Sequence, residues 1–151
     1  PLGRFVQIVR DGRAVAYSML RAPWWDGTLK SWWWGDIPDG YRDEYEDSGR
    51  DPLILAGIVW KHLLDLTAVE IENIPAERIL TIRYTDFLKD PMATIDEVCR
   101  HTGLDMSERF ERRLKRFRIW NADEAWRAKL TDSQITSLES SLLSHLQRYG
   151  F

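Results

Sequence analysis

Arg10 is the first residue in the chain whose type and position together suggest chemistry. It follows the apolar run 5–9, FVQIV, whose β-branched members predict a buried strand. In open α/β sheets, ligands bind beyond the carboxyl ends of the strands. A guanidinium at that place can donate paired hydrogen bonds to a phosphate. Arg10 is therefore a candidate anion-binding residue.

Ser18 is a second candidate, because a helix is predicted directly after Arg10. Asp11 can cap a helix over about 12–21, and the N-terminus of such a helix offers N–H groups and partial positive charge to an anion. Ser18 lies two turns into that helix, and helical side chains lean back toward the N-terminus. Strand, arginine, helix and serine thus form a candidate phosphate clamp. In the alternative interpretation, Arg10 is an ordinary surface arginine and Ser18 a neutral helix residue.

The elements that would position these residues are typical of an α/β fold. A second apolar strand is predicted over 79–83, and the helix start Asp51-Pro52 opens a long apolar helix between the two strands. A strand, a helix and a second strand favour parallel pairing. Asp90 and Ser107 are predicted N-caps, and Thr131 opens a capping box. We expect parallel strands at 5–9 and 79–83, with helices near 12–21, 52–73, 91–102, 108–117 and 132–148.

Residues 23–50 form a Trp-rich segment that we expect to be a loop. It holds five of the eight tryptophans, and seven acids stand against two arginines between residues 36 and 51. One interpretation is a long surface connection whose tryptophans pack back onto the core. The other is a loop that shapes a binding cleft, since long ordered loops in compact domains are often functional.

The composition of the chain argues against several classes of protein. The 151 residues carry a net charge of −3, which argues against a generic nucleic-acid binder. The single cysteine, Cys99, excludes an internal disulfide framework and predicts a reducing, cytoplasmic compartment. No run reaches the roughly 18 apolar residues of a membrane span, so none is expected. His62, His101 and His145 are isolated in the sequence, and no metal site is predicted.

Two segments resemble sulfotransferases that use 3′-phosphoadenosine 5′-phosphosulfate. Residues 5–18, FVQIVRDGRAVAYS, are similar to the family's 3′-phosphate-binding segment, in which a strand precedes Arg-Asp-Pro-Arg-Asp-Val-Ala-x-Ser. The step from Arg10 to Ser18 fits that pattern, and Gly12 stands where Pro is usual. Residues 79–91 resemble a second family segment, in which Tyr84 occupies the tyrosine position that contacts the cofactor nucleoside. Weaker similarities cover residues 32–42, 95–104 and 126–131.

The resemblance implies a fold and a function. The expected fold is a partial three-layer, P-loop-like sulfotransferase fold, with a short parallel sheet flanked by helices. We expect one sulfotransferase-like domain over 1–151, truncated at its N-terminus. The implied reaction moves a sulfuryl group from the nucleotide, without a metal, to a small-molecule hydroxyl or amine acceptor. Arg10, Ser18 and Tyr84 would hold the 3′-phosphate and nucleoside half of the nucleotide.

Two other functions remain open from the sequence. One is a non-catalytic remnant of the same fold that binds a nucleotide or a partner. The other is an interaction domain whose exposed aromatic side chains bind sugars or protein without a nucleotide site. The acceptor and the oligomeric state, a homo-oligomer included, are not readable from the sequence.

Departures from the family pattern affect the predicted activity. The family's phosphosulfate loop and its usual base precede the segment equivalent to residue 5, so no catalytic residue is assigned. The nearest similar stretch is 27–31, with Lys30, but no predicted strand leads into it. The family's late basic segment is replaced by 120–125, which has no base, and Arg116 or Arg118 is a candidate substitute. We expect residues 1–151 alone to be inactive in sulfuryl transfer.

Overall fold

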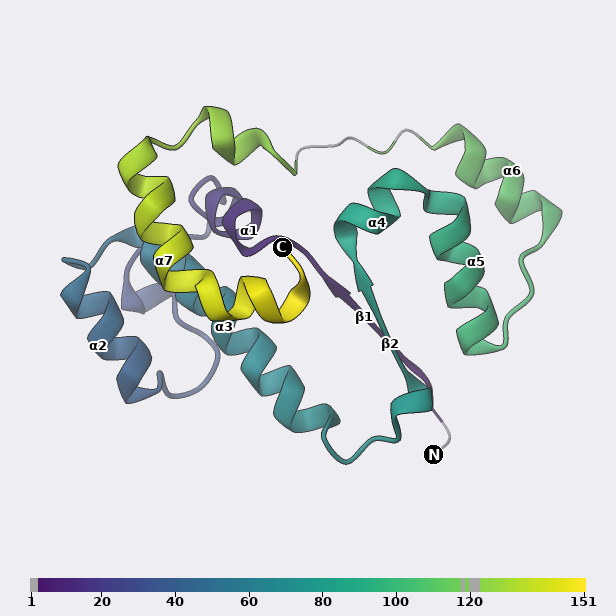
Figure 1. The fold of residues 1–151 in the computed structure, drawn as a ribbon, viewed down its shortest axis with the longest axis horizontal. Helices are drawn as coiled ribbons and strands as arrows, with labels where there is room; N and C mark the ends of the chain where they lie inside the picture. Colours follow the sequence, from purple (N-terminus) through teal and green to yellow (C-terminus); the bar gives the residue numbers. More distant parts are fainter. Residues whose placement is uncertain (1–2, 118, 120–122) are drawn as a thin grey trace. The chain divides into compact units, whose positions relative to one another are not determined.

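The computed structural model describes residues 3–117, 119 and 123–151 (Figure 1). Packing divides the chain into two compact units. Unit 1 comprises residues 1–10 and 72–122, and unit 2 comprises residues 11–71 and 123–151. This division describes how the residues pack. That residues 1–151 form one sulfotransferase-like domain stays a prediction.

The sheet lies in unit 1 and has the predicted strands. Strand β1 (Phe5–Val9) pairs in parallel with β2 (Ile79–Arg83), in a register that runs from Phe5 opposite Ile79 to Val9 opposite Arg83. Both strands have the predicted bounds, and the predicted α/β class with a short parallel sheet is confirmed. The 3-10 turn η2 (Ala76–Arg78) leads into β2.

Three helices follow β2 among the described residues of unit 1. They are α4 (Tyr84–Lys89), α5 (Pro91–Thr102) and α6 (Glu108–Arg116), and α5 packs against both β2 and α6. The predicted caps are present: Asp90 accepts a hydrogen bond from the amide of Ala93 at 2.9 Å, and Ser107 accepts one from the amide of Phe110 at 3.2 Å. Gly103 ends α5 in the left-handed conformation, at φ 73°. Helix α4 was not predicted, because six residues carry too little periodic pattern.

Strand β1 is more exposed than predicted. Of its five residues only Val9 is buried, while Phe5, Val6 and Ile8 are exposed. The described sheet contains only β1 and β2, so an apolar strand here has few neighbours to cover it.

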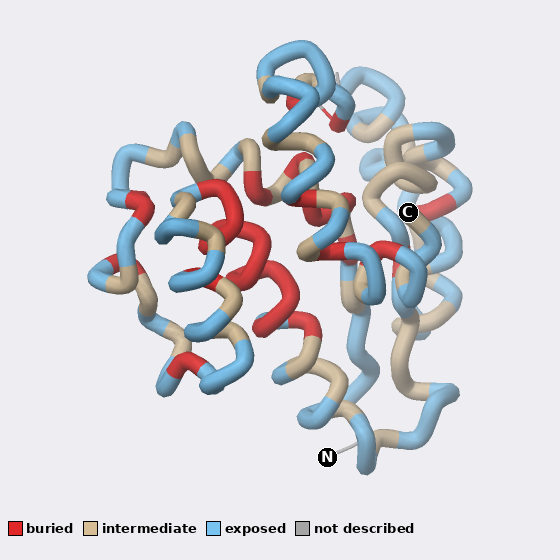
Figure 2. The backbone as a smooth tube through the Cα atoms, turned by 60° about the vertical axis from the view of Figure 1, so that its left-hand side comes forward, coloured by how far each residue is buried: buried red, intermediate tan, exposed pale blue. Residues whose placement is uncertain are grey.

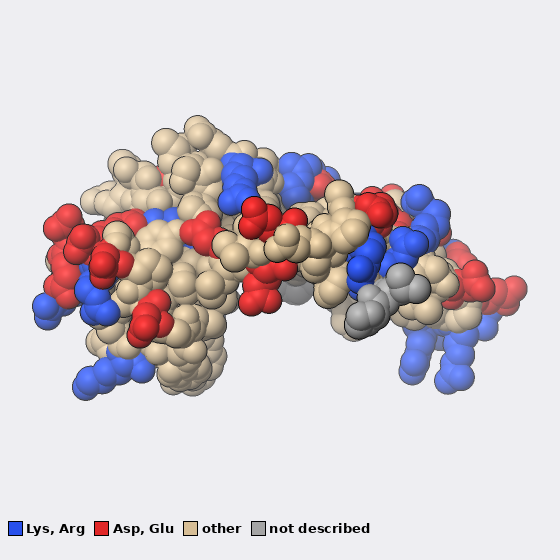
Figure 3. Space-filling view, turned by 90° about the horizontal axis from the view of Figure 1, so that it is seen from below, with Lys and Arg blue, Asp and Glu red and all other residues tan. Residues whose placement is uncertain are grey.

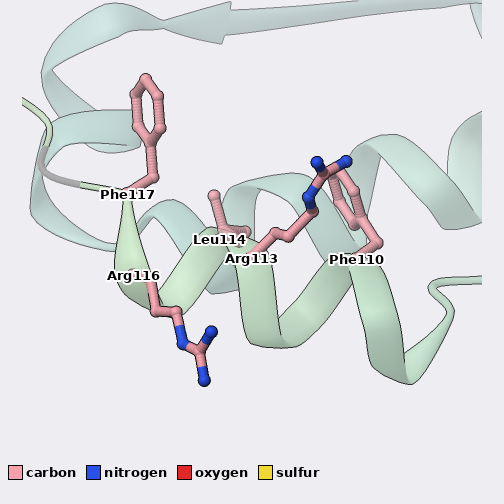
Figure 4. Close-up of a pocket in the computed structure, with 5 residues that line it drawn as sticks. All are labelled: Phe110, Arg113, Leu114, Arg116 and Phe117. Atoms are coloured by element: carbon pink, nitrogen blue, oxygen red, sulfur yellow. The ribbon is translucent and has the colours of Figure 1, made fainter.

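The apolar row of α6 is exposed at Phe110 and Phe117 and half-buried at Leu114, although apolar residues at this helical spacing ordinarily face a core. Phe110, Leu114 and Phe117 project to one side of the helix, whereas Arg116 points to the other (Figure 4). They line an open hollow of about 570 Å³, and Phe117 is 72% exposed. The apolar side chains of α6 therefore share one face of the helix, but no described element packs closely enough on this face to bury it.

Unit 2 is built around one long helix. Helix α3 (Pro52–Ile71) packs against α1 (Gly12–Met19) and α7 (Asp132–Tyr149), and α2 (Asp39–Asp47) lies beside it. The buried residues of unit 2 concentrate along α3 (Figure 2). The first half of α3 is buried all round, including Leu55 and Ile58, and Leu138 and Leu142 of α7 are buried as well. These two leucines lie next to Gly57 of α3. Each such side chain contributes roughly 1.5–3 kcal/mol by leaving water.

By length and composition alone, α3 could cross a membrane. The sequence criterion of 18 consecutive apolar residues does not predict a membrane span here, because Lys61, His62 and Asp65 interrupt the apolar run. In the structure, 61% of its most apolar stretch is buried inside the protein. That burial is the usual environment of a central helix in a globular unit.

The Trp-rich segment 23–50 is more regular than predicted. It contains the 3-10 turn η1 (Leu29–Ser31) and helix α2, which the sequence analysis missed because α2 is highly charged and has few apolar residues. Trp25 packs into the core, whereas Trp24 and Trp33 are exposed, with ring centroids 5.5 Å apart. Trp25 therefore packs as the first interpretation predicts, and a binding cleft shaped by this segment stays a prediction.

Gly12, the first residue of α1, lies against the indole ring of Trp60 on α3. A Cβ atom at position 12 would lie 2.6 Å from Trp60 Cε3, closer than real contacts allow. The resembling family has Pro at this place, and Trp60 leaves no room for a pyrrolidine ring. The close approach of α1 to α3 therefore requires glycine here.

Gly12→Ala should lower the free energy of unfolding by about 1–3 kcal/mol, the usual cost of overpacking a core. Gly40→Ala on α2 is the matched control, because nothing lies within 4 Å of its added Cβ. That change should stabilise the protein by about 0.5–1 kcal/mol, since alanine favours a helix. Denaturant unfolding of both variants tests this, and equal stabilities would contradict the packing argument.

Candidate functional site

Arg10 and Tyr84 lie side by side at the carboxyl edge of the sheet in unit 1. The last residues of the two strands, Val9 and Arg83, are register partners, so the residues that follow them emerge at the same level. The Arg10 guanidinium lies over the ring of Tyr84, with Cζ 5.1 Å from the ring centroid. Two of the three residues named from the sequence are thus in contact, at the sheet edge where ligands of α/β folds bind.

Tyr84 starts helix α4 and is held by aromatic packing. Its ring centroid lies 6.1 Å from that of Phe87, one turn later. Beside it, Arg83 Nε donates to Asp86 Oδ2 at 2.8 Å. This hydrogen bond, with a further contribution from Lys89, holds the pKa of Asp86 below its usual value. The acidic residue nearest to Tyr84 in α4 is therefore paired with cations.

Ser18 lies on α1, in unit 2, and is exposed. The N-terminus of α1 differs from the open anion site that the sequence predicts. Asp11 accepts a hydrogen bond from the amide of Arg13 at 2.8 Å, as a capping residue should. The Asp11 carboxylate therefore already places negative charge at the N-terminus of α1, and this charge would repel a bound anion.

Arg13 is a structural residue rather than a surface one. Its guanidinium pairs with Asp11 at 2.7 Å and with Glu139 of α7 at 2.6 Å. The hydrogen bond to Asp11 is the main cause of a raised pKa for Arg13, and burial only partly opposes it. Arg13 Cζ also lies 4.8 Å from the ring of Trp126, which is buried in the 3-10 turn η3 (Ala125–Ala128). Arg13 therefore ties α1 to α7 and η3.

The stretch around Lys30 is a local turn and not a phosphate cradle. Asp26 accepts hydrogen bonds from the Thr28 amide at 2.8 Å and from the Ser31 hydroxyl. These bonds, with that of Ser31 the largest cause, hold the pKa of Asp26 below its usual value. The Lys30 amide donates to the Thr28 hydroxyl at 3.2 Å. A carboxylate at the centre of the turn disfavours an anion there.

One candidate substitute for the late basic segment, Arg116, lies in unit 1. Arg116 is exposed on α6 and points away from the apolar row of that helix (Figure 4). Arg118 lies outside the described residues, as do positions 120–122 of the segment that lacks a base.

A cluster of polar side chains in unit 2 was missed by sequence reasoning. Tyr41 of α2 donates a short hydrogen bond to Asp65 Oδ2 of α3, and His145 Nε2 of α7 lies 2.9 Å from Asp65 Oδ1. Burial opposes ionisation of Asp65, but these hydrogen bonds and the nearby charge of Arg148 outweigh it and lower its pKa. For Tyr41, burial first and then the bond to Asp65 raise the pKa.

Two further contacts extend this cluster. His62 is 94% buried, and its Nε2 lies 3.1 Å from the carbonyl oxygen of Trp34, so this nitrogen carries a proton. The buried ammonium of Lys61 bonds both oxygens of Glu44, at 2.8 and 2.6 Å, and the carbonyl of Ser141 at 3.1 Å. Within residues 3–117, 119 and 123–151, no three His, Cys, Asp or Glu side chains are placed to hold a metal ion.

The charged side chains of unit 2 are unevenly distributed. Acidic side chains gather over α2 (Figure 3, left), in keeping with the five acids in its nine residues. The single signal that sequence reasoning could have used for α2 is the spacing of Tyr41 and Tyr45, one helical turn apart.

Comparison with known proteins supports the resemblance stated from the sequence. Residues 1–108 match the model of the sulfotransferase family. The chain belongs to the sulfotransferase family. No curated protein and no solved structure matches it. The sulfotransferase match spans β1 through α5 and ends at the start of α6, so it includes Arg10, Ser18 and Tyr84. The similarity noted at 126–131 lies beyond it.

The fold agrees with this membership. A short parallel two-stranded sheet among helices is consistent with part of a sulfotransferase fold. In this sulfotransferase-family chain, Arg10 and Tyr84 stand at the ends of two strands that lie more than seventy residues apart in the sequence. The strand register alone brings them together.

Arg13→Met should lower the free energy of unfolding by about 3–5 kcal/mol, because it leaves the buried carboxylate of Asp11 without its cation. Arg50→Met is the matched control, since its pair with Glu46 is exposed to solvent. That variant should change stability by at most about 1 kcal/mol. Chemical denaturation followed by circular dichroism measures both. Equal losses would show that Arg13 is no more important to the fold than a surface arginine.

The stability of unit 2 should fall at alkaline pH because of Tyr41. Its pKa in the folded protein is raised above the value in the unfolded chain, so its contribution is complete below about pH 10 and is lost as the pH rises toward the folded-state pKa. Tyr41→Phe should flatten the dependence of unfolding free energy on pH above that point. Tyr149→Phe on α7 leaves Tyr41 in place and serves as control. An unchanged slope in Tyr41→Phe would contradict the assignment.

Proposed function

We propose that this sulfotransferase-family chain carries the 3′-phosphate and nucleoside half of a site for 3′-phosphoadenosine 5′-phosphosulfate. The sulfuryl group of that nucleotide would pass to a hydroxyl or amine of a small-molecule acceptor. The observation that carries the proposal is the contact between Arg10 and Tyr84 at the carboxyl edge of the parallel sheet.

The chemistry of these two side chains suits the two halves of the ligand. A guanidinium stacked on a ring presents its N–H donors in its own plane, where they can meet phosphate oxygens in pairs. The aromatic ring of Tyr84 offers a flat apolar surface to a nucleoside. The contact with the Tyr84 ring also restricts the rotamers of Arg10, which lowers the entropy lost when a phosphate binds.

Ser18 is proposed as the third ligand residue because its position in the family pattern matches. Its hydroxyl can donate one hydrogen bond to the phosphate, which is a smaller contribution than that of a charged group. In the proposed reaction, the sulfur–oxygen bond to the departing nucleotide bisphosphate breaks as the bond to the acceptor oxygen or nitrogen forms. A base takes the acceptor proton. The residues discussed here bind and orient the nucleotide, and none of them is assigned as that base.

Adenosine 3′,5′-bisphosphate should bind the protein, and isothermal titration calorimetry on the full chain measures the affinity. Arg10→Ala should weaken binding by about 1.5–3 kcal/mol, the range for hydrogen bonds to charged groups. Ser18→Ala should cost about 0.5–1.5 kcal/mol. Arg4→Ala, which removes an exposed arginine just before β1, should leave the affinity nearly unchanged.

The same titration separates the alternatives. Binding with equal losses in the Arg10 and Arg4 variants would indicate nonspecific attraction of the anion and contradict the proposed site. No binding at all would favour an interaction domain that uses its exposed tryptophans. Residues 1–151 alone are expected to bind the nucleotide without transferring labelled sulfuryl to phenols, sugars or amines, so transfer by this chain would contradict that expectation.

A further inference from the structure

A second cavity lies wholly within unit 2, between α2 and the second half of α3. Its volume is about 580 Å³, and its lining includes four residues of the polar cluster described above: Tyr41, Glu44, His62 and Asp65. Nothing in the nucleotide proposal uses this cavity. Its walls show which kind of molecule would fit.

One wall is apolar and open to solvent. Leu66 and Val69 line the cavity and are 43% and 67% exposed. Pro38 and Tyr41 also line the cavity. Exposed apolar side chains that surround a hollow typically mark a binding site for an apolar group, because a ligand there removes them from water.

The polar side chains of the cavity accept hydrogen bonds but have no donor left to offer. The Tyr41 hydroxyl proton goes to Asp65, and the His62 Nε2 proton goes to the Trp34 carbonyl. All three protons of the adjacent Lys61 ammonium are used by the two oxygens of Glu44 and the carbonyl of Ser141. A ligand that only accepts hydrogen bonds therefore finds no partner among these groups.

Several acceptor positions remain. Each oxygen of the Asp65 carboxylate has one protein donor, and a carboxylate oxygen can accept two. Because the His62 Nε2 carries the proton, its Nδ1 is an acceptor for which the described residues provide no donor. Asp65 is ionised at neutral pH, and the positive charge of Lys61 is balanced by Glu44.

We propose that this cavity binds an organic molecule with an apolar body and a hydrogen-bond-donating group, an ammonium or a hydroxyl. The apolar body lies against Leu66 and Val69. The donor group reaches the carboxylate of Asp65 or the imidazole of His62. The inference depends on unit 2 alone and stands independently of nucleotide binding.

Three probes that share a phenylethyl body test the donor requirement, on the full chain without nucleotide. They are 2-phenylethylamine, 2-phenylethanol and the methyl ether of that alcohol, which only accepts hydrogen bonds. Titrations followed by amide NMR should show shifts at Tyr41, His62 and Val69 with the amine or the alcohol. The ether should bind about fivefold more weakly, the effect of one unmade hydrogen bond. Whether the amine or the alcohol binds more tightly identifies the donor as charged or neutral.

A matched pair on α3 tests the apolar wall. Leu66→Ser should weaken binding of the better probe about three- to tenfold, because it removes part of the apolar contact. Leu63→Ser is the control, since Leu63 is 38% exposed on the same helix but does not line the cavity. Val69→Ser should behave like Leu66→Ser, and its high exposure makes loss of folding a poor explanation. Thermal unfolding checks that each variant is folded.

Several results would overturn the proposal. One is equal affinity for the ether and the donor probes, because the cavity would then be only apolar. Another is equal weakening by Leu63→Ser and Leu66→Ser. A third is the absence of shifts at the cavity residues with every probe, while adenosine 3′,5′-bisphosphate still binds the same sample. That last outcome would reject this site and leave the nucleotide site intact.

Discussion

The parallel pairing of β1 with β2 is the constraint on which the candidate nucleotide site depends. Because Val9 and Arg83 are register partners, the residues after them leave the sheet at the same level and at the same edge. Arg10 can therefore stack on Tyr84. A shift of one residue in register would move the side chains of β1 to opposite faces and separate this pair.

A different interaction organises unit 2. Gly12 allows α1 to approach α3 so closely that Trp60 lies directly over its first turn. Arg13, the next residue, crosslinks the same helix to α7 through Glu139. The two arginines of the sequence RDGR therefore have different roles. Arg10 follows the sheet in unit 1, and Arg13 stabilises the helical core of unit 2.

The polar cluster in unit 2 shows how partial burial strengthens hydrogen bonds between side chains that are far apart in the sequence. Tyr41, Asp65 and His145 are unremarkable in the sequence, and they come from three helices. Once they are brought together in a partly buried place, their hydrogen bonds are stronger than in water, and the donors among them are used up. What remains is a cavity lined by acceptors and apolar side chains.

Local signals in the sequence determined both strands, the ends of the long helices and the family. Caps such as Asp11, Asp90 and Thr131 act on amides two or three residues away, so no knowledge of the rest of the chain is needed to predict them. Even the meeting of Arg10 and Tyr84 follows from two strand ends and parallel pairing. Helix α2, the exposure of β1 and α6, and the cluster around Asp65 were decided by tertiary structure. They depend on which surfaces pack against one another across long sequence separations, and neither residue type nor spacing carries that information.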